Sequence, residues 1–90
     1  MEATTETKTK IIVPIVHLNG TGKQELIRQR DDAWRALDKA YKAIVAMSPN
    51  GRDYYPQPGL MEQAVAQSER RQRLIHSIME EIEFEIGEIN

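Results

Sequence analysis

The chain has 90 residues, carries 12 Lys and Arg against 14 Asp and Glu for a net charge of −2, and contains no cysteine. A chain this short forms one small domain, which without disulfides or a cysteine-bound metal must be idealised or bury apolar surface against copies of itself. The weakly acidic balance argues against a broad surface for binding DNA or a membrane, which would need clustered positive charge on one face. The longest apolar run, 11–16, is shorter than the ~20 residues of a membrane span, and no secretory leader is recognisable. We therefore expect a self-associating cytoplasmic protein.

The first eighteen residues divide into two parts. Residues 1–10 are mostly Thr, Glu and Lys, a composition that predicts a disordered polar leader without chemistry of its own. Residues 11–18 are rich in β-branched side chains and include Pro14, which favours an extended segment or an edge strand. We expect this segment to pack as an apolar strap on a neighbouring surface.

Two helical segments follow, over 22–47 and 60–87. Thr21 and Gln24 have the spacing of a capping box ahead of the first, whose apolar residues recur every three or four positions except where Arg30 interrupts them. A loop over 48–59 contains three prolines, and Gly87 is expected to end the second helix. The apolar positions of the second segment are Leu60, Met61, Ala64, Val65, Leu74, Ile75, Ile78, Met79, Ile82, Ile86 and Ile89.

These elements predict an all-α fold, a long antiparallel two-helix hairpin over 11–90 with a short extended N-terminal segment. The segment 22–47 holds six basic and four acidic side chains, and 60–90 holds three basic and seven acidic ones, so the helices should attract one another. Two packed helices leave part of each apolar stripe facing water, which predicts cover by other copies in a symmetric helical oligomer.

Catalytic machinery is not evident. There is no cysteine nucleophile, and no serine lies in a nucleophile elbow. His76 and Glu80 share a helix face and could hold a metal, but Arg73 occupies the place where a di-iron bundle needs Glu, so a packed or solvated histidine is the simpler interpretation. Residues 20–23 (GTGK) lack the rest of a Walker A motif. We expect no catalytic residue, metal site or cofactor.

Two loops offer binding chemistry. Residues 17–23 (HLNGTGK) place backbone amides, a hydroxyl and a lysine at a helix N-terminus, where the helix dipole favours anions. Residues 49–56 (PNGRDYYP) offer a guanidinium for phosphate and two tyrosines for stacking on bases. The alternative is structural: an ordinary helix cap with a glycine entry, and a turn whose tyrosines plug the end of the bundle. The loops lie at opposite ends of one hairpin, but antiparallel packing of two copies would bring them together in a composite pocket.

At these loops the sequence resembles the hairpin domain of phage anti-CBASS and anti-Thoeris signal sponges. The resemblance spans about 11–89, with its motifs in 13–21 (VPIVHLNGT) and 49–55 (PNGRDYY). It implies a hexamer in the cytoplasm of an infected bacterium that binds cyclic nucleotide immune signals between subunits without cleaving them. The implied ligands are cyclic di- or trinucleotides. Cyclic ADP-ribose isomers are less favoured, because the chain has only about ten polar residues where the anti-Thoeris type has a β-rich portion.

The resemblance and the chemistry of the residues together give the candidate binding positions. Those matching the motifs are Asn19, Gly20, Thr21, Asn50, Gly51, Arg52, Asp53 and Tyr54, and those inferred from chemistry alone are Lys23, Arg28 and Tyr55. The alternative function is a structural or protein-interaction helical oligomer with no nucleotide ligand. Neither interpretation involves DNA or a membrane.

Overall fold

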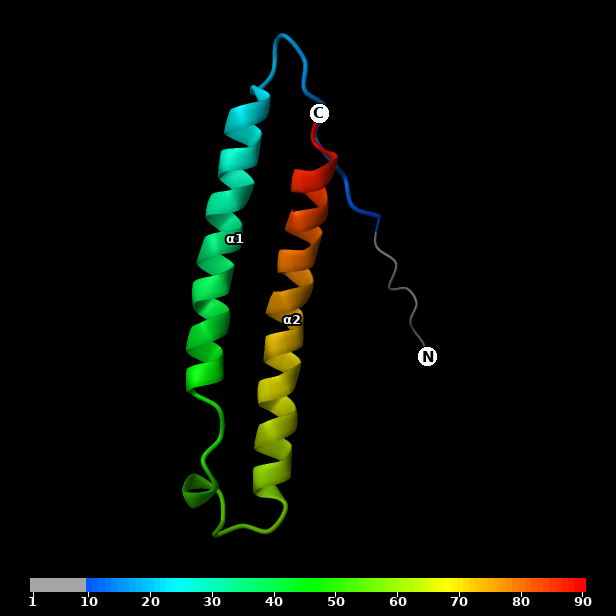
Figure 1. Cartoon of the computed structure of the whole chain (residues 1–90). Helices are drawn as coiled ribbons and strands as arrows, with labels where there is room; N and C mark the ends of the chain where they lie inside the picture. Colours follow the sequence, from blue (N-terminus) through cyan, green and yellow to red (C-terminus); the bar gives the residue numbers. More distant parts are fainter. Residues whose placement is uncertain (1–9) are drawn as a thin grey trace.

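The computed structural model describes residues 10–90, so the predicted polar leader lies outside the described residues apart from Lys10. Two antiparallel helices, α1 (Lys23–Ala46) and α2 (Leu60–Glu88), run side by side and are joined by a loop that contains one 3₁₀ turn, η1 (Gly51–Asp53) (Figure 1). Residues 10–90 contain no strand. The predicted helical hairpin is confirmed, and the molecule is elongated, with principal extents of 62 × 31 × 16 Å.

The start of α1 differs from the prediction in its cap. Gly22 is the N-cap residue, with extended backbone, and no side chain accepts a hydrogen bond from the first amides of the helix. The predicted capping box between Thr21 and Gln24 is therefore wrong. Thr21 lies one residue before the cap, whereas a capping box requires the hydroxyl on the cap residue itself.

The loop between the helices is shaped by its backbone. Ser48 Oγ donates to the carbonyl of Val45 at 2.6 Å, just after α1 ends. Asn50 Oδ1 then accepts from the amide of Arg52 at 2.9 Å and caps η1. Gly59 adopts a left-handed backbone with φ 83°, from which α2 begins. These local contacts agree with the loop predicted over 48–59.

The end of α2 lies slightly later than expected. The helix continues through Gly87 to Glu88, and Ile89 closes it by donating its amide to the carbonyl of Glu85 at 3.0 Å. Among the glycines of the described chain only Gly59 has a positive φ, so Gly87 does not provide the left-handed turn of a glycine terminator. The prediction that Gly87 ends the helix is therefore wrong by one residue, and the buried Ile89 is the residue that caps it.

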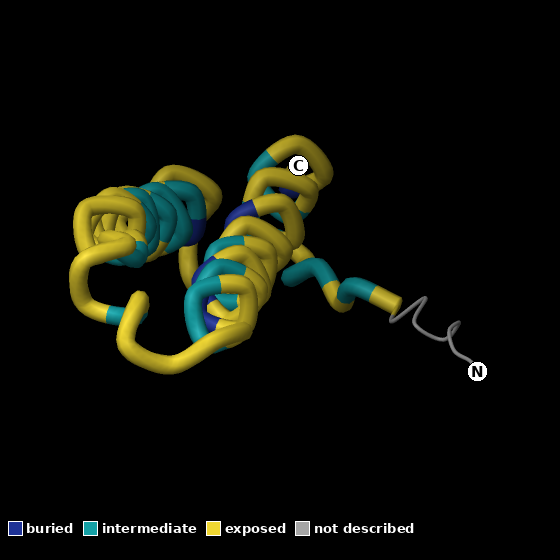
Figure 2. Tube along the Cα trace, turned by 90° about the horizontal axis from the view of Figure 1, so that it is seen from below, coloured by how far each residue is buried: buried dark blue, intermediate teal, exposed yellow. Residues whose placement is uncertain are grey.

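The core between the helices is thin. Figure 2 shows few buried segments along the trace, and none of the large side chains in residues 10–90 is less than 2% exposed. Several members of the predicted apolar stripes instead face outward, among them Val45, Leu74 and Ile78. The expectation that a lone hairpin leaves part of each stripe uncovered is confirmed. The buried residues are Leu26, Ala64, Ser68, Met79 and Ile89.

Residues 11–17, before α1, belong to no helix and pair with no strand of residues 10–90, which agrees with the extended-segment alternative of the prediction. This segment runs beside the C-terminal end of α2 (Figure 1). Val13 and Val16 are half-buried, whereas Ile12, Ile15 and Leu18 are 73%, 81% and 97% exposed. One side of the strap therefore packs on its own chain and the other side is bare.

Two polar contacts cross between the helices. Arg30 Nε donates to Glu85 Oε1 at 2.9 Å, with the side chains 24% and 21% exposed. Trp34 Nε1 donates to Glu83 Oε2 at 2.7 Å. The ion pair with Glu85 explains why Arg30 interrupts the apolar stripe of α1. It is also an attractive contact between a basic residue of α1 and an acidic residue of α2.

Neither described helix combines the length and apolarity that crossing a membrane would need.

Candidate functional site

The two candidate loops lie at opposite ends of the hairpin (Figure 1). The 24 residues of α1 separate them, a distance of about 36 Å at the rise of an α-helix. One copy of the chain therefore does not bring the loops together, as the hairpin geometry required. A pocket that uses both loops needs residues from more than one copy.

The first loop is a tight turn packed by a histidine. The amide of Gly20 donates to the carbonyl of His17 at 3.2 Å. A Cβ added at Gly20 would lie 2.7 Å from His17 Nε2, whereas one at Gly22 would meet nothing within 4 Å. A side chain at position 20 would therefore have to displace the exposed imidazole of His17. The amide of Gly20 is already used, whereas the first amides of α1 that follow Gly22 are open to a ligand.

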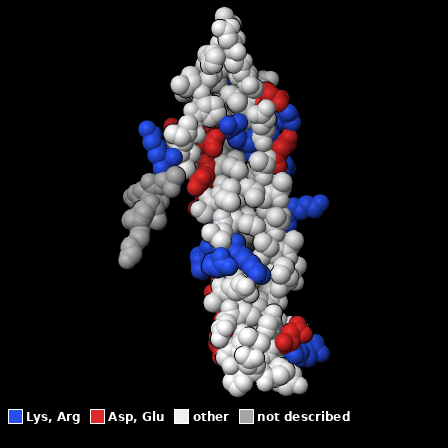
Figure 3. Space-filling view, turned by 180° about the vertical axis from the view of Figure 1, so that it is seen from behind, with Lys and Arg blue, Asp and Glu red and all other residues white. Residues whose placement is uncertain are grey.

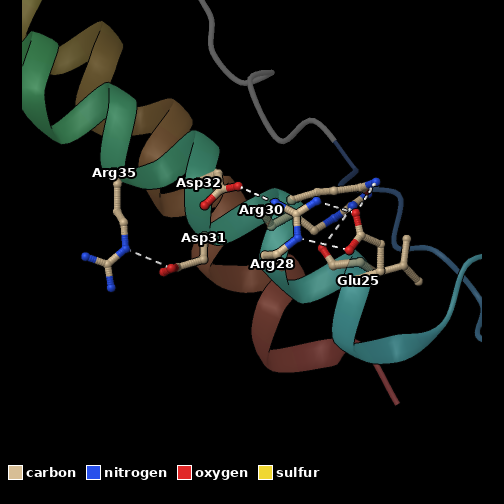
Figure 4. Close-up of polar contacts among 8 residues, drawn as sticks. Glu25, Arg28, Arg30, Asp31, Asp32 and Arg35 are labelled. Carbon is tan, nitrogen blue, oxygen red and sulfur yellow. Dashed lines mark hydrogen bonds and ion pairs between the residues drawn. The ribbon is translucent and has the colours of Figure 1, made fainter.

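The first turn of α1 also carries an acidic side chain, Glu25, that is paired with Arg28 (Figure 4). Glu25 accepts from Arg28 Nε at 2.9 Å, and Arg28 Nη1 donates to Asp32 at 2.7 Å. The hydrogen bond from Arg28 lowers the pKa of Glu25, and the bond to Glu25 raises the pKa of Arg28. Arg28 is therefore held by two carboxylates, with which a phosphate would have to compete. Lys23 makes no ion pair with any residue of 10–90 and is exposed.

The second loop presents an uncommitted guanidinium. Arg52 is exposed, and its side chain forms no hydrogen bond or ion pair with the described part of the chain. Its own backbone amide is fixed by Asn50, whose side-chain NH₂ group still faces solvent as a donor. Asp53 is exposed beside Arg52 within the same 3₁₀ turn. The loop thus holds a cation, an amide and a carboxylate on a fixed backbone.

The structure separates the two adjacent tyrosines. Tyr54 is half-buried and lines a hollow of about 250 Å³ with Leu60 and Ala64 at the start of α2. Tyr55 is 79% exposed. Tyr54 therefore matches the structural alternative, in which a tyrosine plugs the end of the hairpin, and Tyr55 is the ring that is free to stack on a base.

A groove on the side of the hairpin was not identified from the sequence. It has a volume of about 480 Å³ and is lined by residues of both helices, including Tyr41, Arg73, His76 and Glu80. The Tyr41 and His76 rings lie 5.9 Å apart, and His76 Nδ1 is 3.6 Å from Glu80 Oε2. No three His, Cys, Asp or Glu side chains of residues 10–90 converge as metal ligands. The only sequence signal for the groove was the shared helix face of Arg73, His76 and Glu80.

Comparisons with protein families, with curated proteins and with solved structures find no match for this chain.

Proposed function

We propose that this protein is a non-enzymatic sponge that binds cyclic di- or trinucleotides in pockets between subunits of a homo-oligomer and holds them unchanged. The observation that carries the proposal is the exposed pair of Arg52 and Tyr55 on the loop between the helices. A guanidinium and an aromatic ring are the groups that bind a phosphate and a base, and neither contributes to the core of the hairpin.

Each group has a chemical role in this proposal. Arg52 would bind a phosphate through two parallel N–H donors, and Tyr55 would stack on a base. Asn50 and Asp53 offer a donor and an acceptor for base edges or ribose hydroxyls. From another copy, Lys23 and the first amides of α1 would bind a second phosphate at the positive end of the helix dipole.

The loop is suited to binding because its shape does not depend on the side chains of Arg52 and Tyr55, the two groups that would contact phosphate and base. The cap by Asn50, the three prolines and the left-handed Gly59 fix the backbone. A preorganised loop loses less conformational entropy on binding, which raises affinity. In an infected bacterium, tight binding would lower the concentration of a free immune signal below the level its effector needs.

A thermal-shift panel tests the proposal. The purified protein is heated with cyclic dinucleotides, cyclic trinucleotides, cyclic ADP-ribose isomers and linear nucleotides, and the ligand is then recovered and analysed by chromatography. A ligand that binds only the folded state at a hundredfold excess over Kd stabilises it by about 2.7 kcal/mol. We expect a shift with a cyclic di- or trinucleotide that is recovered intact. No shift with any compound would favour the structural oligomer, and a cleaved ligand would contradict the non-enzymatic assignment.

A pair of arginine variants assigns the site. Arg52→Ala removes a charge-assisted contact of about 1.5–3 kcal/mol and should weaken binding about 10- to 150-fold. Arg35→Ala is the matched control, because Arg35 is exposed in the middle of α1 and its partner, Asp31, lies in the same helix (Figure 4). Binding by the control should equal that of the wild type. Equal binding by Arg52→Ala would remove Arg52 from the site.

A further inference from the structure

We infer that α2 pairs in antiparallel orientation with α2 of a second copy of the chain, through the face formed by Arg71, Leu74, Ile78 and Glu81. We refer to these four residues as the α2 pairing face. At 3.6 residues per turn they fall within an arc of about 80° around the helix. This arc lies beside the surface that packs on α1, so a second helix can occupy it without displacing the first.

The middle of the α2 pairing face is apolar and uncovered. Leu74 is 54% exposed and Ile78 is 46% exposed, although each is large and aliphatic. They are four residues apart and therefore adjacent on the helix surface. Exposed aliphatic side chains in the centre of a long helix are the feature that contact with another helix would bury.

The ends of the face are complementary to each other in charge. A two-fold axis midway between Leu74 and Ile78 also lies midway between Arg71 and Glu81, since both pairs are centred on position 76. In an antiparallel pair, Leu74 would therefore oppose Ile78 of the second copy, and Arg71 would oppose its Glu81. Neither charged side chain forms an ion pair with a residue of 10–90. Such self-complementarity is what an isologous interface between identical chains requires.

α1 reaches this side at Glu85, which lies in the same arc one turn beyond Glu81 and binds Arg30. It leaves Leu74 and Ile78 exposed. Trp34 and Tyr41 contact Glu83 and His76, which lie on the flank of α2 away from the pairing face. The opposite flank of α1 consequently lies on the side of the pairing face, and it carries the exposed small residues Ala33, Ala36 and Ala40. A neighbouring helix can approach closely over small side chains.

The area available is close to what a dimer needs. Two helices about 36 Å long whose axes are 8–10 Å apart present a face on the order of 700 Å². A stable protein–protein interface buries about 800 Å² on each partner. The buried core of one hairpin is thin. Contact between two such faces would create a four-helix arrangement with a thicker core.

This pairing would also place the candidate loops together. Because the axis lies near position 76, the Leu60 end of one α2 would meet the Ile89 end of the other. The loop that carries Arg52 would then approach the turn at Gly20 of the second copy. A shared ligand pocket at these loops rests on the proposed function, whereas the pairing of the two α2 helices requires no ligand.

Charge reversal tests the pairing. The variants are Arg71→Glu, Glu81→Arg and the double swap, with Arg73→Glu as the control, because Arg73 is exposed and lies about 200° around the helix from Arg71. The association constant is measured by sedimentation equilibrium, and far-UV circular dichroism checks the helical content. Each single reversal should weaken association at least about tenfold, since like charges would then face each other, and the swap should return it to within about threefold.

A crosslink provides a second measurement that leaves the charges intact. The chain has no cysteine, so Leu74→Cys and Ile78→Cys can be made separately and mixed before mild oxidation. The mixture should give a crosslinked dimer in greater yield than either variant alone.

The outcomes separate this inference from the proposed function. The inference is overturned by a wild-type protein that is still monomeric at about 100 μM, by reversals that behave like Arg73→Glu, or by no excess crosslink in the mixture. An oligomer that the charge reversals weaken, but that shows no thermal shift with any nucleotide, would support the pairing and reject only the sponge. Charge-reversed monomers that still bind nucleotide as tightly as the wild type would support the pairing and reject the shared pocket.

Discussion

The two ends of the hairpin are held in different ways. At the end where α1 begins and α2 finishes, Leu26 and Ile89 are buried, and Arg30 and Trp34 bind the opposite helix. At the loop end the buried side chains are small ones, Ala64 and Ser68, and no ion pair between the described helices lies there. The face in Figure 3 shows the same contrast, with mixed charges gathered toward the first end.

The difference shows which end of the hairpin leaves its side chains free of packing. At the first end, the side chains pack in the core or bind the opposite helix, so packing fixes those residues. The loop end is shaped by local backbone chemistry, which leaves Arg52 and Tyr55 free. A loop whose conformation is set by its backbone can vary its exposed side chains with little effect on the fold, which is why binding residues gather on such loops.

The largest expected effect is the loss of packing at the first end. Leu26→Ala removes a side chain that is 9% exposed and should lower the free energy of unfolding by about 2–4 kcal/mol. Val45→Ala, at a position nearer the loop that is 42% exposed, should lower it by less than about 1 kcal/mol. Urea unfolding at one fixed protein concentration measures both. Equal losses would contradict the contrast between the ends.

The ion pair across the helices should give the next largest effect. Arg30→Met leaves Glu85 half-buried without its partner and should destabilise the protein by about 1–3 kcal/mol. Adding Glu85→Leu removes the stranded charge and should recover most of the loss. A double-mutant cycle on unfolding free energies gives the coupling between the two residues. A cycle that shows no coupling would mean that the contact contributes nothing to stability.

Two glycine substitutions sharpen the account of the loop. Gly59→Ala forces a side chain into a left-handed conformation with φ 83° and should destabilise by about 1–2 kcal/mol. Gly87→Ala lies within α2 and faces open space, so it should stabilise by about 0.5–1 kcal/mol. Thermal unfolding of the two variants should shift in opposite directions. A higher melting temperature for Gly59→Ala would show that the loop does not need the left-handed conformation at position 59.

The smallest effect is electrostatic and lies at the start of α1. The ordinary pKa of Glu25 is 4.5, and its hydrogen bond with Arg28 lowers it in the folded protein. The pair therefore stabilises the folded state above pH 4.5, and this contribution disappears as the pH falls through the lowered pKa. NMR titration of the Glu25 carboxyl should give a lower midpoint in the wild type than in Arg28→Gln. Identical midpoints would mean that the pair does not form in solution.

The sequence predicted those features that depend on local pattern. Both helices, the proline-rich loop and the partly uncovered stripes follow from apolar spacing and turn residues. The partner of Arg30 could not be predicted, because Glu85 lies 55 positions away. Tyr54 and Tyr55 have the same chemistry in sequence and differ only through the packing of Tyr54 on α2. The Thr21 cap failed because a shift of one residue in the helix start removes the hydroxyl from the capping position.

The central claim is that a ligand site forms from the loop of one copy and the helix start of another. Its most direct test is to co-express Arg52→Ala with Lys23→Ala and to titrate the mixed oligomer with the cyclic nucleotide that the wild type binds. Each variant alone lacks one half of every pocket and should bind weakly or not at all. Random mixing in a symmetric oligomer should restore about a quarter of the sites to wild-type affinity. A mixture that binds no better than its components, or a single variant that binds as the wild type does, would contradict the shared pocket.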